Sequence, residues 1–126
     1  MRKTIVKASL ATMLSLTVLP HPARSADLTF TCNLSSVFRG ADFHLRRRID
    51  IFSDTKIVRI YDDYGPGFKP LPYAGRLVAA DGQDIFYDYP NSTRSHISRK
   101  SGSFYAAGAG AVTQGTCSAS VPNPPQ

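Results

Sequence analysis

Apolar and polar side chains alternate along most of this 126-residue chain, and this alternation restricts the fold more than any other feature. In residues 27–34, for example, Leu28, Phe30, Cys32 and Leu34 share one parity, and threonine and asparagine occupy the other. A period of two is typical of a strand with one buried face. Turn signals recur about every 8–12 residues, as in all-β sandwiches and barrels. We therefore expect an all-β fold.

The same pattern places the expected strands. After residues 27–34, the alternation over residues 42–61 predicts a hairpin, in which Arg47 falls on the apolar side and is expected near a strand edge. An Asp-Gly turn at residues 81–83 predicts a second hairpin, and residues 62–67 and 108–111 have the composition of loops. The other expected strands are residues 76–80, 84–89, 95–100, 103–107 and 114–121.

The first residues of the chain have the order of a secretory signal peptide. A cationic start with Arg2, Lys3 and Lys7 precedes an apolar run, and small residues surround the expected cleavage after Ser25. The apolar run is shorter than the ~20 residues that span a bilayer, so no membrane span is expected. We predict a signal peptide over residues 1–25, a single β domain over 26–121, a flexible tail over 122–126, and a mature protein that is periplasmic or secreted.

Cys32 and Cys117 lie close to the two ends of the predicted domain. In an exported protein an even number of cysteines predicts a disulfide, and two cysteines allow a single pairing. Two free buried thiols or a metal pair are the alternative, although the spacing matches neither a zinc motif nor a redox motif. A bridge needs Cα atoms within about 6 Å, so the first and last strands should be neighbours or face each other across a core. The expected architecture is a small antiparallel barrel or sandwich closed by one disulfide.

The basic character of the chain comes largely from the predicted leader. The formal charge is +6, but the expected mature chain has eleven Lys and Arg against nine Asp and a net charge of +2. Arg46, Arg47 and Arg48 form the densest basic run, and on a strand their side chains divide between two faces. A nucleic-acid-binding protein needs a concentrated basic face, so no nucleic-acid partner is expected.

The sequence contains no motif that assigns a catalytic or metal-binding role to particular residues. A triad built on His44 or His96 would also need a nucleophile and an orienting acid, and the sequence marks neither. The aspartates within residues 62–63 and 81–84 lack the spacing of a calcium loop and are interpreted as turn-forming. We expect no catalytic residue, no metal site and no cofactor. A small secreted hydrolase that uses His44 or His96 with an Asp is the alternative.

Aromatic side chains are frequent, with six Tyr and seven Phe in the chain. Long loops rich in Gly and Pro on a rigid sheet commonly carry binding. Tyr61, Tyr64 and Phe68, in and beside the Gly/Pro loop that follows Tyr61, are therefore candidate binding residues. The alternative is that they form ordinary cross-strand pairs.

Three short segments resemble a pattern found in small exported bacterial β-proteins, most of which have no assigned function. Phe30–Cys32 lies near the start of the domain, and Ile97–Gly102 and Gly115–Cys117 fit the pattern I-x-R-x-[ST]-G … G-x-C. The plan of a leader followed by an all-β domain with a cysteine near each end is also similar to that of periplasmic inhibitors of c-type lysozyme. In those inhibitors a Ser-Gly-x-x-Tyr segment inserts into the lysozyme cleft. Residues 101–105 fit that string, so the resemblance implies that Ser101 and Tyr105 are binding residues.

These patterns favour an exported protein that acts by non-catalytic binding, with a protein or a cell-envelope component as its partner. Inhibition of lysozyme is one concrete form of that activity.

Overall fold

The computed structural model describes residues 25–120, and all regular elements within that range are strands. The predicted signal peptide, apart from Ser25, lies outside the described residues, as do the predicted tail and Val121. The strands are β1 (Leu28–Phe38), β2 (Ala41–Phe52), β3 (Ile57–Asp63), β4 (Lys69–Pro70), β5 (Gly75–Ala80), β6 (Asp84–Tyr89), β7 (Thr93–Ser98), β8 (Ser103–Gly108) and β9 (Ala111–Ser120).

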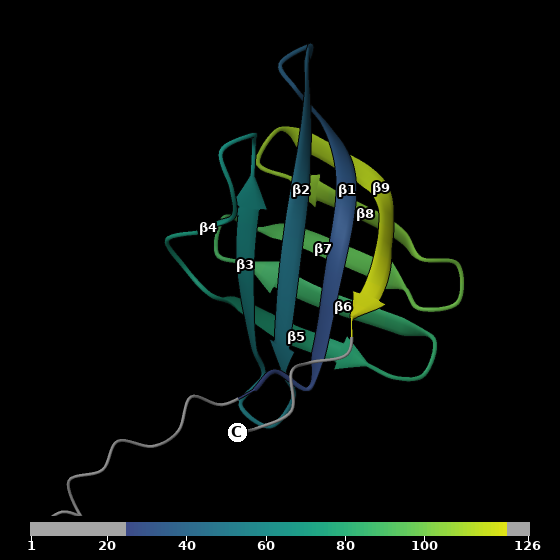
Figure 1. Ribbon diagram of the computed structural model, residues 1–126. Helices are drawn as coiled ribbons and strands as arrows, with labels where there is room; N and C mark the ends of the chain where they lie inside the picture. Colours follow the sequence, from purple (N-terminus) through teal and green to yellow (C-terminus); the bar gives the residue numbers. More distant parts are fainter. Residues whose placement is uncertain (1–24, 121–126) are drawn as a thin grey trace, which may run out of the picture.

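The strands close into an antiparallel barrel. The sheet runs in the order β2-β1-β9-β8-β7-β6-β5-β3, and β3 also pairs with β2, so that eight strands form a ring. The short strand β4 pairs with one end of β3, and β5 pairs with the other end. In Figure 1, β1, β2 and β3 lie in front and β5 to β8 cross behind them. The all-β prediction is confirmed, and the architecture is a barrel rather than a sandwich.

Alternation along each strand decides which side chains fill the barrel. In β1, Phe30, Cys32 and Leu34 are buried, and the residues between them face outward or are only partly covered. Each large apolar side chain removed from water contributes about 1.5–3 kcal/mol, which makes this shared interior the main source of stability. The buried apolar residues are Phe30, Cys32, Leu34, Leu45, Ile49, Ile51, Val58, Ile60, Leu77, Ile85, Tyr87, Ile97, Phe104 and Ala106.

The predicted disulfide is present and joins the first and last strands of the ring. Cys32 of β1 and Cys117 of β9 are direct cross-strand partners with a Cα–Cα distance of 3.9 Å. The two strands are therefore neighbours, which was the first of the two arrangements that the cysteine spacing predicted. The bridge links residues 85 positions apart, so it closes nearly the whole barrel into one covalent loop.

Two turns differ from the sequence prediction. Strand β1 continues beyond residues 27–34 to Phe38 and turns at Arg39-Gly40, and the predicted loop at 108–111 contains only a two-residue turn at Ala109-Gly110. Both central residues of each turn have positive φ, as tight hairpins require. Asn-Gly and Asp-Gly are the usual signals for such turns, whereas Arg-Gly and Ala-Gly are not, and the strands were therefore predicted too short.

The connections gather at two ends of the barrel, which we call the mouth and the base. The mouth contains the β1–β2, β6–β7 and β8–β9 turns and the loop after β3, and the base contains the other three hairpin turns. The mouth connections are residues 39–40, 90–92, 109–110 and 64–68, and the base connections are residues 53–56, 81–83 and 99–102.

Candidate functional site

An ion pair lies inside the barrel. Arg47 of β2 and Asp62 of β3 are direct cross-strand partners. Arg47 donates from Nε to Asp62 Oδ1 at 2.7 Å and from Nη2 to Asp62 Oδ2 at 2.9 Å, and the two side chains are only 16% and 10% exposed. Two predictions are thus wrong: Arg47 does not lie at a strand edge, and Asp62 is not a turn residue. The carboxylate opposite Arg47 is what allows the guanidinium to occupy an inward position.

The same pair keeps Arg47 charged. Burial alone would lower the pKa of the guanidinium, since a buried site disfavours the charged form. The hydrogen bonds and the charge of Asp62, together with Tyr87, outweigh burial and raise the pKa of Arg47 above its ordinary value. Because the charge of Asp62 offsets that of Arg47, the pair is formally neutral.

Tyr87 of β6 and Ser95 of β7 complete this polar cluster and are cross-strand partners. Tyr87 is fully buried, and its hydroxyl has no hydrogen-bond partner of acceptable geometry among residues 25–120. Burial raises the pKa of Tyr87, and Arg47 and Ser95 lie close enough to oppose that rise. Buried hydroxyls are nearly always satisfied in folded proteins, so this one is an exception that needs an explanation.

A cavity of about 280 Å³ opens at the mouth and has three residues of this cluster in its wall. Its polar lining includes Arg47, Tyr87 and Ser95, and its apolar lining includes Phe38 and Leu71. Small-molecule sites in proteins usually combine a mainly apolar concave wall with a few converging polar groups. The cavity, with Arg47, Tyr87 and Ser95, was not predicted from the sequence.

The predicted aromatic residues near the mouth have arginine neighbours. The guanidinium of Arg48 lies 5.3 Å from the centre of the Tyr61 ring, and that of Arg46 lies 4.9 Å from the centre of the Phe68 ring. Tyr64 is 65% exposed. The basic run thus divides between the two faces of β2, as predicted from strand alternation, and each of its arginines contacts an aspartate.

Asp63 organises the loop that carries Tyr64. Its Oδ1 accepts hydrogen bonds from the backbone N–H groups of Gly65 at 2.7 Å and Gly67 at 2.9 Å. These bonds lower the pKa of the Asp63 carboxyl. The prediction that the acidic residues form turns therefore holds for Asp63, whereas Asp62, one position earlier, faces the interior.

The other predicted binding residues, Ser101 and Tyr105, lie elsewhere on the barrel. Ser101 is in the β7–β8 turn at the base, and Tyr105 is an exposed residue on β8. In the ring, β8 is separated from β3 by three strands in either direction, so Tyr105 and Tyr61 are on opposite sides of the barrel. The five predicted binding residues therefore form two separate groups.

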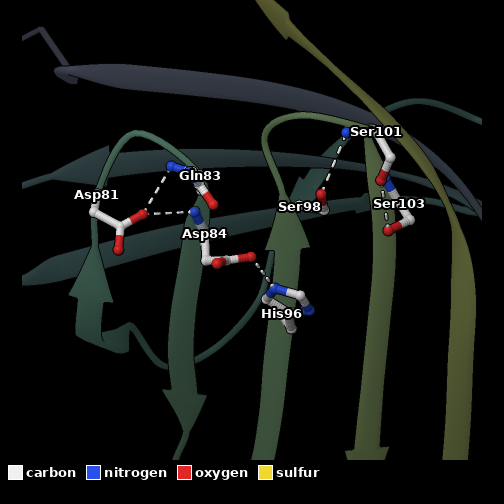
Figure 2. Close-up of polar contacts among 7 residues, drawn as sticks. All are labelled: Asp81, Gln83, Asp84, His96, Ser98, Ser101 and Ser103. Atoms are coloured by element: carbon white, nitrogen blue, oxygen red, sulfur yellow. Dashed lines mark hydrogen bonds and ion pairs between the residues drawn. The ribbon is translucent and has the colours of Figure 1, made fainter.

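Hydrogen bonds hold the β7–β8 turn in shape, as Figure 2 shows for its serines. Ser98 Oγ accepts from the Ser101 N–H at 3.2 Å, and the hydroxyls of Ser101 and Ser103 are 3.0 Å apart. The Gly102 N–H donates to the Ser98 carbonyl at 2.8 Å, and the Cys117 N–H donates to the Gly102 carbonyl at 2.6 Å. The turn is thus attached directly to the strand that carries the disulfide.

Both histidines of the predicted mature domain are on the outer wall. His96 Nε2 hydrogen-bonds Asp84 Oδ1 at 2.7 Å, and its ring stacks on Phe86 with centroids 4.4 Å apart. His44 Nδ1 lies 3.1 Å from Ser35 Oγ on an exposed surface. Figure 2 shows the His96–Asp84 pair near the hydrogen-bonded serines of the next turn but not bonded to them. Neither histidine lines the mouth cavity.

Two kinds of feature are absent from residues 25–120, the part of the chain that the structure describes. There, no three His, Cys, Asp or Glu side chains gather into a potential metal site. No helix in that part has the length and apolar character of a membrane span.

Comparisons with protein-family models, with curated proteins and with solved structures each find no match for this chain. The class of the protein therefore follows from its own structure: it is a closed, disulfide-bonded, eight-stranded antiparallel barrel with a polar cluster in a cavity at one end. The disulfide is consistent with an oxidising compartment outside the cytosol.

Proposed function

We propose that the protein is an exported, non-catalytic binding protein and that its contact element is the β7–β8 turn with Ser101, together with Tyr105 on the adjoining strand β8. The observation that supports this most is the rigidity of the turn. A Cβ atom on Gly102, whose φ is +80°, would lie 2.8 Å from the Cys117 carbonyl oxygen. Such a turn is already ordered before it meets a partner, and preorganisation reduces the entropic cost of binding.

The charge of the turn supports an acidic cleft as its target. Arg99, Lys100 and Ser101 are all exposed at the tip. Arg99 is held in place because its Nη1 donates to the Asp81 carbonyl at 2.8 Å. Lysozymes of the c type cleave their substrate with two carboxyl groups in a cleft, and cations favour such surroundings. Inhibition of a c-type lysozyme is therefore the concrete form of the proposal that we put forward first.

The proposed location is the periplasm or the outside of the cell. The signal-peptide pattern of the first 25 residues and the disulfide that closes the barrel both support export. The proposed partner is a protein or another component of the cell envelope.

Lysozyme inhibition can be tested by measuring how fast a c-type lysozyme lyses a cell-wall suspension in the presence of the protein. Oxidised protein should inhibit lysis at micromolar excess, and Ser101→Glu and Tyr105→Ala should weaken that inhibition, since one adds a negative charge at the tip and the other removes an exposed ring. Tyr73→Ala is the matched control, because Tyr73 is also an exposed tyrosine and lies outside the proposed contact element. Full lysozyme activity in the presence of the wild-type protein would exclude this form.

A photo-crosslinking amino acid tests the broader proposal of a contact surface. Placed at position 105, it should capture an envelope component that the same group at position 73 does not capture. Equal capture at both positions, or none at either, would remove the β7–β8 turn as the contact element.

The hydrolase alternative depends on one contact, the His96–Asp84 hydrogen bond of 2.7 Å. His96 could act as a base only if a substrate reached the outer wall beside it. If the protein is a hydrolase of this kind, His96→Asn should abolish turnover of an activated ester such as p-nitrophenyl acetate. We expect wild-type and variant to hydrolyse this ester equally slowly.

A further inference from the structure

We propose that the mouth cavity is a binding site for a small, uncharged, mainly apolar molecule that carries a hydrogen-bond-accepting group such as a carbonyl. This site is independent of the proposed contact element, because the β7–β8 turn is at the base and the cavity opens at the opposite end.

The size and lining of the cavity favour a small ligand. Ligand pockets usually measure about 300–1,000 Å³, and this cavity, of about 280 Å³, is near the lower end. Phe38, Leu71 and Tyr89 provide apolar wall, and Ile60 and Ala106 line it among the barrel core residues. A ligand body that matches this wall must be largely apolar.

The Tyr87 hydroxyl determines which polar group the ligand should carry. It is buried in the barrel and its residue lines the cavity. Arg47 and Ser95 lie close to it, but neither makes a hydrogen bond of acceptable geometry with it, nor does any other described residue. A phenylalanine would fill almost the same space without burying an unsatisfied group. A ligand that accepts a hydrogen bond from this hydroxyl would satisfy it, whereas a pure hydrocarbon would not.

The Arg47–Asp62 pair determines the charge that the ligand can carry. Nε and Nη2 of Arg47 already donate to Asp62, and the two charges offset each other. An anionic ligand beside Arg47 would find its guanidinium already bound to the Asp62 carboxylate, and burying the charge of the ligand there would be costly. A neutral acceptor such as a ketone, ester or amide carbonyl avoids both penalties.

The surface around the mouth provides an apolar approach. A second hollow shares Ser36, Phe38 and Ala111 with the cavity and adds Phe43 and Tyr64, both of which are exposed. Exposed apolar side chains grouped at an opening are a recognised feature of ligand-binding surfaces. Tyr64, predicted from the sequence as a binding residue, thus has a place at this site.

Two probes of similar shape separate the polar requirement from simple filling of the cavity. Acetophenone carries a carbonyl, and isopropylbenzene replaces that oxygen with a methyl group. In NMR titrations of the oxidised protein, acetophenone should shift the Arg47 Nε–Hε signal and the Tyr87 ring signals in a saturable way. The hydrocarbon leaves water more readily than the ketone, so the measure is the ratio of the two affinities, ketone over hydrocarbon. This ratio should be about tenfold higher for the wild type than for a variant without the Tyr87 hydroxyl, which is the effect of one good hydrogen bond.

Tyr87→Phe is the decisive variant, because it removes the hydroxyl and keeps the ring. Its ketone-to-hydrocarbon affinity ratio should be about tenfold lower than that of the wild type. Its urea midpoint should be equal to or above that of the wild type, since the lost hydroxyl makes no hydrogen bond of acceptable geometry within the described residues. Tyr73→Phe, at an exposed tyrosine outside the cavity, should change neither result. If Tyr87→Phe does not fold, Ala111→Leu provides the second test: it narrows the opening and should block both probes.

Three results would overturn the proposal. The absence of saturable shifts with either probe would mean that the cavity holds only water, which can also satisfy a buried hydroxyl. A ketone-to-hydrocarbon affinity ratio that is the same in the wild type and in Tyr87→Phe would remove the requirement for an acceptor at the Tyr87 hydroxyl. Probe binding that survives Ala111→Leu would place the binding elsewhere.

Discussion

Arg47 of β2 binds Asp62 of β3 through two hydrogen bonds inside the barrel, at distances of 2.7 and 2.9 Å. On the outside, Arg94 binds Asp88 through the same atoms at 2.7 and 2.8 Å. The two pairs differ mainly in exposure: the side chains are 16% and 10% exposed in the first and 58% and 28% exposed in the second. The chain thus contains its own control for the effect of burial on an ion pair.

We predict that Asp62→Asn destabilises the protein far more than Asp88→Asn does. The first change leaves the buried Arg47 charge without a counter-charge and should cost about 3–5 kcal/mol. The second removes an exposed pair, for which the cost should be below about 1 kcal/mol. Urea unfolding of both variants at pH 7 measures the difference, and equal losses would contradict the buried position of the pair.

Replacement of both partners should restore much of the stability. In Arg47→Met/Asp62→Leu no buried charge remains, and apolar side chains of similar length can pack into the core. The double variant should therefore unfold at higher urea than Asp62→Asn. A double variant less stable than the single one would indicate that the pair stabilises the barrel beyond mere compensation of charge.

The strands could be predicted because their signal is local. Leu28, Phe30 and Leu34 fall on one parity within a few residues, and that parity alone predicts a strand with one buried face. The disulfide could be predicted because two cysteines allow only one pairing. The hairpin turns at Arg39-Gly40 and Ala109-Gly110 were missed because their residue types are not those that usually adopt positive φ in pairs.

The buried cluster could not be predicted in the same way, because its members meet only through the register of the strands. The unusual parity of Arg47 was visible, but its partner Asp62 is 15 residues away and lies opposite it only because of the length of the β2–β3 turn. Tyr87 and Ser95 join them only when the ring closes. The available signal was a charged residue at a position where the alternation otherwise places apolar side chains. Such a residue is better interpreted as an indication that a buried counter-charge lies on a neighbouring strand.

We predict that Cys32→Ala/Cys117→Ala lowers the free energy of unfolding by about 4–5 kcal/mol. The bridge joins residues 85 positions apart, and the chain-entropy estimate for a loop of that length gives this magnitude. Urea unfolding of the double variant and of wild-type protein in reducing agent should give matching midpoints. An unchanged free energy of unfolding after removal of the bridge would contradict the estimate.

The close approach of β1 and β9 predicts that Gly115→Ala is destabilising. A Cβ atom on Gly115 would overlap the backbone carbonyl of Asn33, which cannot move without separating the two strands. Overpacking of this kind costs about 1–3 kcal/mol or more. Gly82→Ala is the matched control, because a Cβ there meets nothing within 4 Å, and its effect should stay within about 0.5 kcal/mol. Similar thermal midpoints for the two variants would contradict the predicted overlap.

The β5–β6 turn, which contains Asp81, predicts that the protein loses stability in acid. Asp81 Oδ1 accepts from the N–H groups of Asp84 at 2.8 Å and Gln83 at 2.7 Å, as Figure 2 shows, and these bonds lower the pKa of Asp81 below its ordinary value of 3.8. Since the carboxylate is favoured in the folded state, its contribution to stability is complete above pH 3.8 and is lost as the pH falls through the lowered pKa.

Asp81→Asn tests this dependence, because it keeps an oxygen acceptor and removes the charge. The urea midpoint of the wild type should exceed that of the variant at pH 7, and the two should converge as the pH falls below the ordinary carboxyl pKa of 3.8. Because the effect comes mainly from hydrogen bonds over short distances, 0.5 M NaCl should leave most of the difference at pH 7 in place. A difference that stays constant from pH 7 to pH 2.5 would show that the Asp81 carboxylate has the same pKa in the folded and unfolded chains.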